Sequence, residues 1–336
     1  MTIKFAAIGL RIHGPGAIRE ILAAGDTRFV AVAETGEERR QEAAQRYGVP
    51  VYADHEEMLE KERPDLVIVC PTHDRKARIS AECLARGVHV LVDKPLATTP
   101  GDLDILEAEI RTGKAELSMM LTERFGPTFI RLKEMVDAGE LGELAGFVAL
   151  RPHELRTAEV DSLAWMVHPL RGAGIIVDLM VHDIDLVRWY SKREVVQVYA
   201  RHHTSRPDLP GIPLMAQALF TLEGGIPATV ETDWLTPRAT PWDCRFFVTG
   251  TTGSAEIKSL GFNELVVWQQ ERPHRVVEVA RQRTDSSGQD LVRRIRGQEP
   301  RILQAVDAVA AARATLAARE SALTGRIVEV PPAKAT

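Results

Sequence analysis

The first 120 residues alternate between short apolar runs and longer segments rich in charge and alanine, and this alternation constrains the fold more than any other feature. Runs that are apolar on both faces and are joined by helices are typical of a parallel sheet covered on each side. We therefore predict an α/β domain with a doubly wound parallel sheet over residues 1–120. Strands are expected at residues 3–8, 29–33, 49–53, 66–69, 88–92 and 115–119, and helices at 17–24, 37–47, 56–62, 75–86 and 100–111.

After residue 121 the pattern changes to strands separated by glycine turns. Gly224-Gly225 and Thr251-Thr252-Gly253 are typical of hairpins. Residues 121–336 are therefore predicted to form an α+β domain with a mostly antiparallel sheet. We interpret the arginine-rich stretch 284–298 as a loop and residues 301–323 as a C-terminal helix that ends at Gly325. A further helix is expected at 129–138, and strands at 144–150, 195–203, 214–222, 228–234, 244–249, 254–258 and 265–268.

Charge and composition argue against several classes of partner. The formal net charge is -5 and the sequence pI is about 6.1, so the chain lacks the basic character of proteins that bind nucleic acid or anionic membranes. The N-terminal residues are interpreted as a first strand and not as a secretion signal, and the sequence has no apolar stretch of membrane-spanning length. We expect a cytoplasmic protein, with three cysteines that are too few and too scattered for a disulfide framework.

The turn after the first predicted strand contains a glycine motif with one substitution. It reads Gly9-Leu10-Arg11-Ile12-His13-Gly14, so Arg11 stands where a dinucleotide-binding G-x-G-x-x-G turn has its second glycine. That glycine normally lets the backbone approach a pyrophosphate, and Arg11 is predicted to compensate with charge-assisted hydrogen bonds of its own. The motif alone is equally consistent with a tight turn that binds no dinucleotide.

Glu34 favours the dinucleotide interpretation. It ends the second predicted strand, where an acidic residue can accept hydrogen bonds from both hydroxyls of an adenosine ribose. Because a carboxylate also repels a 2′-phosphate, we predict NAD and not NADP, although Arg39 and Arg40 lie close enough in sequence to tolerate a phosphate. Taken by itself, Glu34 could equally be a solvated acid in a loop.

Three residues form a candidate catalytic set. Lys94, in Asp93-Lys94-Pro95, follows the fifth predicted strand at the edge where parallel sheets bind ligands. Asp178 and His182 lie four residues apart on an apolar and therefore buried helix, where charges tend to be functional. The alternative interpretation assigns no function to these residues: Asp178 and His182 would be an ordinary pair on a helix surface, and Lys94 would be a solvated lysine. A set of metal ligands that includes Asp185 lacks a supporting cluster of histidines or cysteines, so no metal is predicted.

These motifs together resemble the glucose-fructose oxidoreductase, inositol dehydrogenase and rhizopine-catabolism (Gfo/Idh/MocA) family. The resemblance covers nearly the whole chain, and the Lys-Pro step and the helix with Asp178 and His182 are its most specific parts. The motifs that carry it are the turn at Gly9, Glu34, Pro71-Thr72, Asp93-Lys94-Pro95, Gly172-Ala173-Gly174, Asp178-x-x-x-His182 and the TGTTGSAE stretch at 249–256.

The resemblance implies a Rossmann domain, a second domain whose large open sheet carries subunit contacts, and a homodimer or homotetramer. It implies a nicotinamide-dependent oxidoreductase that acts on a hydroxyl of a sugar, polyol or cyclitol. In this scheme His182 accepts the hydroxyl proton, Asp178 orients the imidazole or binds a neighbouring substrate hydroxyl, and Lys94 stabilises the developing alkoxide. The expected cofactor contacts are Gly9, Arg11, Ile12, Gly14, Glu34, Pro71, Thr72, Arg75, Asp93 and Lys94, and the expected substrate contacts are Lys94, Arg124, Trp165, His168, Asp178 and His182.

The chain departs from the family pattern at several positions. Asp93 replaces a glutamate, Arg75 a frequent histidine, Thr122 a frequent asparagine, and Ala173 interrupts a glycine triplet. None of these changes removes a proton-transfer group. Two other functions stay open at this point: an NAD-using glycosidase or lyase-type enzyme without net redox change, and a regulatory protein that binds NAD or another ligand without turnover.

Overall fold

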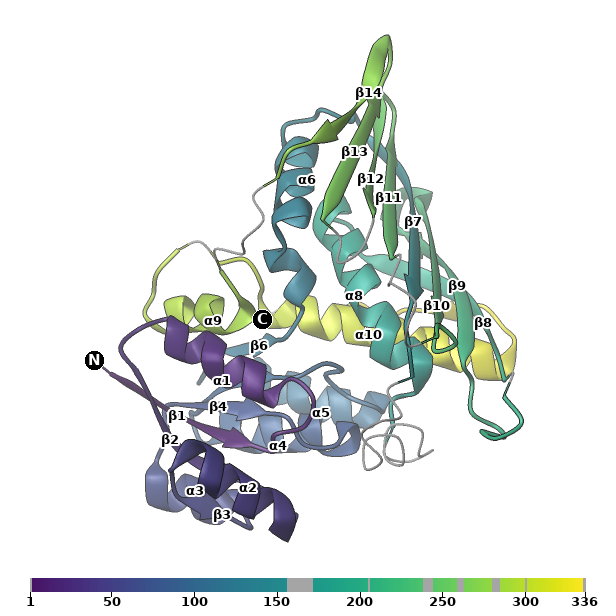
Figure 1. The fold of residues 1–336 in the computed structure, drawn as a ribbon. Coiled ribbons are helices and arrows are strands. Elements are labelled where there is room, and N and C mark those ends of the chain that lie inside the picture. The colour runs from purple at the N-terminus through teal and green to yellow at the C-terminus, as the bar shows by residue number, and fades with distance from the viewer. Residues whose placement is uncertain are drawn as a thin grey trace.

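The computed structural model describes residues 2–155, 172–204, 206–237, 244–258, 263–279, 285–299 and 301–334. Within them the chain forms two β-sheets, one in each half of the molecule, with helices packed on both (Figure 1). The predicted combination of a parallel sheet followed by a mostly antiparallel one is confirmed. The predicted division of the chain at residue 120 stays a prediction.

The first sheet has six parallel strands in the order β3-β2-β1-β4-β5-β6. This is the order of a dinucleotide-binding sheet, in which the direction of winding reverses between β1 and β4. Its strands β1, β4 and β5 are almost entirely buried because helices cover both faces. The strands are β1 (Ile3–Ile8), β2 (Thr27–Ala33), β3 (Val51–Tyr52), β4 (Leu66–Val69), β5 (His89–Val92) and β6 (Leu117–Met119), and the helices are α1 (Gly14–Ala23), α2 (Glu37–Tyr47), α3 (His55–Glu62), α4 (His73–Ala85) and α5 (Pro100–Ile110).

The second sheet has nine strands in the order β14-β13-β12-β11-β7-β10-β9-β8-β15. Within this second sheet, the pair β7 and β10 is the only parallel one among the described residues, and the other strand pairs are antiparallel. The hairpins at Gly224-Gly225 and Thr251-Thr252-Gly253 are confirmed. The strands are β7 (Leu144–Pro152), β8 (Val195–His203), β9 (Met215–Leu222), β10 (Pro227–Asp233), β11 (Arg245–Gly250), β12 (Gly253–Lys258), β13 (Glu264–Gln269), β14 (Arg272–Val277) and β15 (Val328–Glu329), with short 3-10 turns η1 (Thr122–Phe125) and η2 (Glu223–Gly225).

Two helices join the hydrophobic cores of the two sheets. α8 (Gly174–Ser191) and α10 (Ala305–Thr324) lie side by side against the inner face of the second sheet (Figure 1). Each also places side chains in the core beside the first sheet: Val177 and Val181 from α8, and Val309 and Leu316 from α10. This packing carries the polar residues of α8 to the edge of the first sheet. The helix α6 (Pro127–Asp137) covers the far end of the second sheet.

The stretch 284–298 is not a loop, and that prediction is wrong. It contains α9 (Ser287–Ile295), whose N-terminus is capped because the Ser286 hydroxyl accepts a hydrogen bond from the Gln289 amide at 3.3 Å. Leu291 and Val292 are buried against α1 of the first sheet, while most of the remaining positions, among them Arg293 and Arg294, are polar and obscure the helical period. The C-terminal helix begins at Ala305, four residues later than predicted, and the polar edge strand β14 was not predicted.

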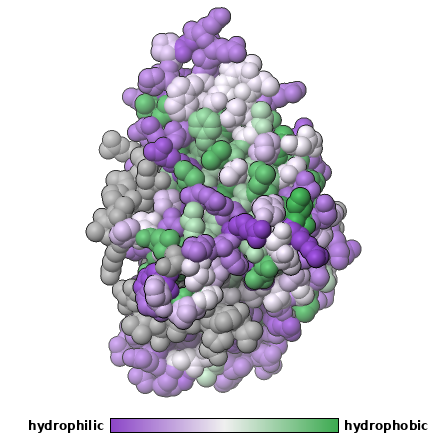
Figure 2. Space-filling view, turned by 90° about the vertical axis from the view of Figure 1, so that its right-hand side faces the viewer, coloured by the Kyte–Doolittle hydropathy of each residue, from purple (hydrophilic) through white to green (hydrophobic). Residues whose placement is uncertain are grey.

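The outer face of the second sheet carries an exposed apolar row. Strand register places Phe247, Val148, Thr229, Leu219 and Tyr199 next to one another across β11, β7, β10, β9 and β8. Val148 is 42% exposed and Leu219 49% exposed. Figure 2 shows this side of the molecule, where hydrophobic side chains gather between hydrophilic ones. We refer to these five residues as the outer row.

Candidate functional site

The glycine turn after β1 is built for close backbone approach. Gly9 has a φ of +75°, and a Cβ there would lie 2.6 Å from the Cys70 carbonyl oxygen, so only glycine fits. At Gly14, the first residue of α1, an added Cβ would lie 3.5 Å from the Gly9 carbonyl oxygen, an ordinary contact distance, so space alone does not require glycine there. Ile12 adopts a left-handed φ of 44° between them. The turn therefore brings the N-terminus of α1 to the sheet edge, where the Gly14 N–H already donates to the Arg11 carbonyl oxygen at 3.0 Å and Pro15 has no N–H.

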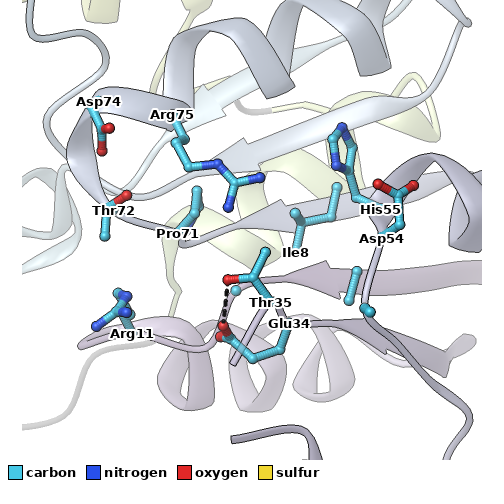
Figure 3. A pocket seen from close by; sticks show the side chains of 13 residues that line it. Ile8, Arg11, Glu34, Thr35, Asp54, His55, Pro71, Thr72, Asp74 and Arg75 are labelled. Carbon is cyan, nitrogen blue, oxygen red and sulfur yellow. Dashed lines mark hydrogen bonds between the residues drawn. The ribbon is translucent and has the colours of Figure 1, made fainter. Parts of the chain in front are cut away.

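A pocket of about 440 Å³ opens beside this turn (Figure 3). It lies over the carboxyl ends of β1, β2 and β4, where nucleotide-binding sheets hold their ligand. Six of the predicted cofactor contacts line it, namely Gly9, Arg11, Glu34, Pro71, Thr72 and Arg75. The predicted contacts Ile12, Gly14, Asp93 and Lys94 are not among its lining residues.

Glu34 has an oxygen that needs a partner. The side chain is only 6% exposed, and its Oε1 accepts a hydrogen bond from the Gly36 amide at 3.3 Å. Its Oε2 is buried without a hydrogen-bond partner within the described part of the chain. Buried carboxylate oxygens normally accept hydrogen bonds, and the hydroxyls of a ribose in this pocket would supply them. The residues present therefore fit an adenosine dinucleotide.

Arg40 is held away from the pocket by other contacts. Its guanidinium donates to the carbonyl oxygens of Glu34 and Thr35 at 3.0 and 2.7 Å and pairs with Glu37 one turn away. A phosphate bound at Glu34 would therefore have to compete with three acceptors for this arginine.

Lys94 and Asp178 meet at the edge of the first sheet. Lys94, just past the end of β5, donates from Nζ to Asp178 Oδ1 at 2.9 Å and to the Asp178 carbonyl oxygen at 3.1 Å. Burial would raise the pKa of the Asp178 carboxyl, but the cation of Lys94 outweighs it and lowers that pKa to about 2. The predicted approach of these two residues, 84 positions apart in the chain, is observed. Their catalytic roles stay predictions.

Asp93 connects the glycine turn to this lysine. Its two carboxylate oxygens contact His13 Nδ1 and Lys76 Nζ, each at 2.8 Å. Lys76 also donates to the carbonyl oxygen of Lys94 at 2.6 Å. Burial opposes ionisation of Asp93, but Lys76 and His13 hold its pKa far below the usual range. The shorter carboxylate at this position is therefore fully engaged with the protein.

His182 contacts an acid that the sequence did not single out. Its Nδ1 lies 2.8 Å from Oε2 of Glu123 in η1, and Arg151 of β7 donates to the other oxygen of Glu123 at 3.1 Å. Burial would raise the pKa of Glu123, but His182 and Arg151 hold it well below the usual range. Of the two roles expected for Asp178, the orienting contact to the imidazole is thus made by Glu123.

Arg124, an expected substrate contact, makes several hydrogen bonds within the protein. Its guanidinium forms a double hydrogen bond with Asp185 at 2.8 and 2.7 Å and also donates to Asp307 and to the Ile302 carbonyl oxygen. The side chain is 2% exposed and connects η1 to α8 and α10, and its role toward a substrate stays a prediction. Asp185 is likewise engaged and does not join Asp178 and His182 in a metal site. Trp165 and His168 lie outside the described residues.

His73 is a further residue that the prediction missed. At the start of α4 it is buried with its Nε2 3.7 Å from Asp178 Oδ1. Burial and the cation of Lys76 lower its pKa well below the usual value, so the imidazole is neutral. No pattern in the sequence joins His73, Lys76 and Glu123 to the site, because their partners are distant in the chain.

None of the helices in the described ranges has the length and apolar character to cross a bilayer.

Two family models match the chain. An oxidoreductase family with an NAD-binding Rossmann fold matches residues 3–120, and the GFO/IDH/MocA C-terminal domain matches residues 129–256. Inositol 2-dehydrogenase 2 of Saccharopolyspora erythraea is 29% identical over 238 residues, which cover 69% of this chain and 66% of that relative. Myo-inositol 2-dehydrogenase of Thermotoga maritima is 28% identical over 200 residues, which cover 59% and 58%. The matches thus span less than two thirds of these curated relatives.

Solved structures share the whole fold. A Thermotoga maritima protein superposes with a TM-score of 0.87 at 25% identity, covering 98% of this chain and 100% of that chain. The scyllo-inositol dehydrogenase of Lactobacillus casei, solved with NAD(H) and scyllo-inositol, has a TM-score of 0.80 at 20% identity and covers 98% and 99%. At the lower identity the likeness concerns the fold alone.

Proposed function

The chain belongs to the GFO/IDH/MocA oxidoreductase family, and from this premise we propose that it is an NAD-dependent dehydrogenase of a cyclitol, polyol or sugar hydroxyl. One observation carries the proposal: the ammonium of Lys94 and the carboxylate of Asp178 are held 2.9 Å apart at the sheet edge that also forms the nucleotide pocket. The names of the relatives support an inositol as the first substrate to test.

The proposed chemistry separates a hydride from a proton. Bound NAD supplies the hydride acceptor. His182 accepts the hydroxyl proton, because imidazole is the side chain whose ordinary pKa lies closest to neutral pH. Lys94 has three ammonium hydrogens, of which two are directed at Asp178, so the third is available to the substrate oxygen. This fixed cation stabilises negative charge as the proton leaves.

NAD is proposed over NADP from the surroundings of Glu34. Its buried carboxylate would repel a 2′-phosphate, and Arg40 is already engaged with two carbonyl oxygens and Glu37. Glu34→Gln should therefore weaken NAD binding and reduce the preference for NAD over NADP. A variant that keeps both affinities unchanged would remove Glu34 from the cofactor site.

The test of the function is a panel of inositols, sugars and sugar acids, assayed by NADH absorbance with NAD and NADP in parallel. Reduced NAD that accumulates with a cyclitol or sugar supports the proposal. Cleavage of a glycoside without net NADH would replace it with the glycosidase alternative. Tight NAD binding without turnover of any compound would replace it with a regulatory role.

The assembly belongs to the same proposal. The outer row is an exposed apolar surface at the centre of a wide sheet, and a second copy of the chain would cover it. We propose a homodimer or homotetramer built on this face, in the cytoplasm, where a reducing environment suits the three free buried cysteines.

A further inference from the structure

Glu123 is an acid that contacts the proposed base His182. It lies in η1, between the two sheets in sequence, and its side chain, which is 12% exposed, contacts residues of α8 and β7. One of its oxygens lies 2.8 Å from His182 Nδ1, and the other accepts a hydrogen bond from Arg151 at 3.1 Å. A carboxylate in such surroundings is fixed in both position and orientation.

Arg151 holds Glu123 in place but does not fully neutralise its charge. The arginine is buried and makes a double hydrogen bond to Asp183, with both distances at 2.8 Å, besides its contact with Glu123. One cation is thus shared between two acids. The remaining negative charge lies against the imidazole, and it is available to stabilise a positive charge that develops there.

The distance also determines where the imidazole hydrogen lies. The Nδ1–H direction is not aligned with Glu123 Oε2 as in a regular hydrogen bond. A lone pair on a nitrogen 2.8 Å from a carboxylate oxygen would nevertheless be repelled by it, so this nitrogen carries the hydrogen. In a neutral imidazole the other nitrogen then holds the lone pair. Nε2 of His182 is consequently the atom that can receive a proton from the substrate.

We propose that Glu123 is a positioning residue that fixes His182 as the Nδ1–H tautomer and stabilises the imidazolium formed when Nε2 takes the hydroxyl proton. The proposal rests on the proposed function, in which His182 is the base. The hydroxyl O–H bond breaks and its proton moves to Nε2, while the carbon loses its hydrogen as a hydride, for which bound NAD would be the acceptor, and the C=O bond forms. Glu123 itself keeps its charge throughout.

The test combines kinetics with a readout of the tautomer. Glu123→Gln keeps the shape but removes the charge, and Glu123→Ala removes the contact. We expect kcat to fall about 10- to 100-fold in both variants, in the range of general acid-base contributions, with little change in the KM for NAD. Glu134→Gln, which removes an exposed acid on α6, is the matched control and should behave as wild type.

The tautomer is read from long-range ¹H–¹⁵N NMR spectra of the ring nitrogens, with the His182 signals assigned by their loss in His182→Asn. Wild type should have a protonated Nδ1 and an unprotonated Nε2 at alkaline pH, and Glu123→Ala should populate the opposite tautomer. A protonated Nε2 in neutral wild-type His182 overturns the proposal, even if the variants do not fold. An unchanged kcat in His182→Asn would instead overturn His182 as the base.

Discussion

Lys94 Nζ lies 2.9 Å from Asp178 Oδ1, so a residue at the end of β5 and a residue on α8 form one buried ion pair. Each partner makes the burial of the other tolerable, because an isolated charge in a protein interior is costly. The pair therefore ties the proposed chemistry of the site to the packing of α8 on the first sheet.

Replacing Lys94 by alanine should lower kcat by at least 100-fold and leave the affinity for NAD nearly intact, because Lys94 is not among the residues that line the nucleotide pocket. The free energy of unfolding should also fall by about 3 kcal/mol, because Asp178 is left as an uncompensated buried charge. Steady-state kinetics, calorimetric titration with NAD and urea denaturation measure the three quantities. Lys61→Ala, at an exposed pair on α3, is the control. A comparable loss of NAD binding would give Lys94 a different role.

Replacing Arg11 by glycine restores the family turn but removes a cation from the pocket. We expect the affinity for NAD to fall about tenfold or more, because a charge-assisted hydrogen bond contributes roughly 1.5 to 3 kcal/mol. Fluorescence titration with NAD measures the change. Arg28→Ala, which removes an exposed arginine near the start of β2, should leave the affinity unchanged. Equal affinities in wild type and Arg11→Gly would mean that Arg11 makes no useful phosphate contact.

Acid should weaken the fold through Asp178. Its pKa in the folded protein is lowered from 3.8 to about 2, so the carboxylate stabilises the fold above about pH 4 and loses this contribution as the pH falls toward 2. The full contribution is about 2 kcal/mol, of which about 1 kcal/mol should be lost between pH 6 and pH 3. Urea denaturation across this range should give a shallower pH dependence for Asp178→Asn than for wild type. Parallel curves would contradict the pairing.

A lysine at Leu219 should disrupt the proposed assembly, because it places a charge in the middle of the outer row. Light scattering after size-exclusion chromatography should give the mass of a dimer or tetramer for wild type and a smaller mass for Leu219→Lys. Val276→Lys changes a side chain that is 61% exposed on β14, outside the outer row, and should keep the wild-type mass. A wild-type mass of about 37 kDa would rule out the assembly.

Local patterns predicted most of the strands, because buried parallel strands are short and apolar and are bounded by turns. They failed for α9, where most positions other than Leu291 and Val292 are polar, and for β14, whose residues are mainly exposed. Contacts with neighbouring elements, and not a periodic pattern of apolar residues in their own sequence, determine where α9 and β14 form.

The same limit applies to the candidate site. Lys94, Asp178 and His182 stand in recognisable motifs, whereas His13, Lys76 and Glu123 are brought in by tertiary contacts. The ion pairs of Arg124 could not be predicted for the same reason, because nothing near it in the sequence indicates that Asp185 and Asp307 would contact its guanidinium.

The placement of α10 in both hydrophobic cores has a mechanical consequence. A helix with side chains in two cores holds the two sheets in a fixed relative position. The sheets cannot move apart about a hinge without exposing the buried face of this helix. We therefore expect thermal unfolding of the two halves to occur as one cooperative transition. The distance from nucleotide pocket to imidazole is then set when the protein folds and not when a ligand arrives.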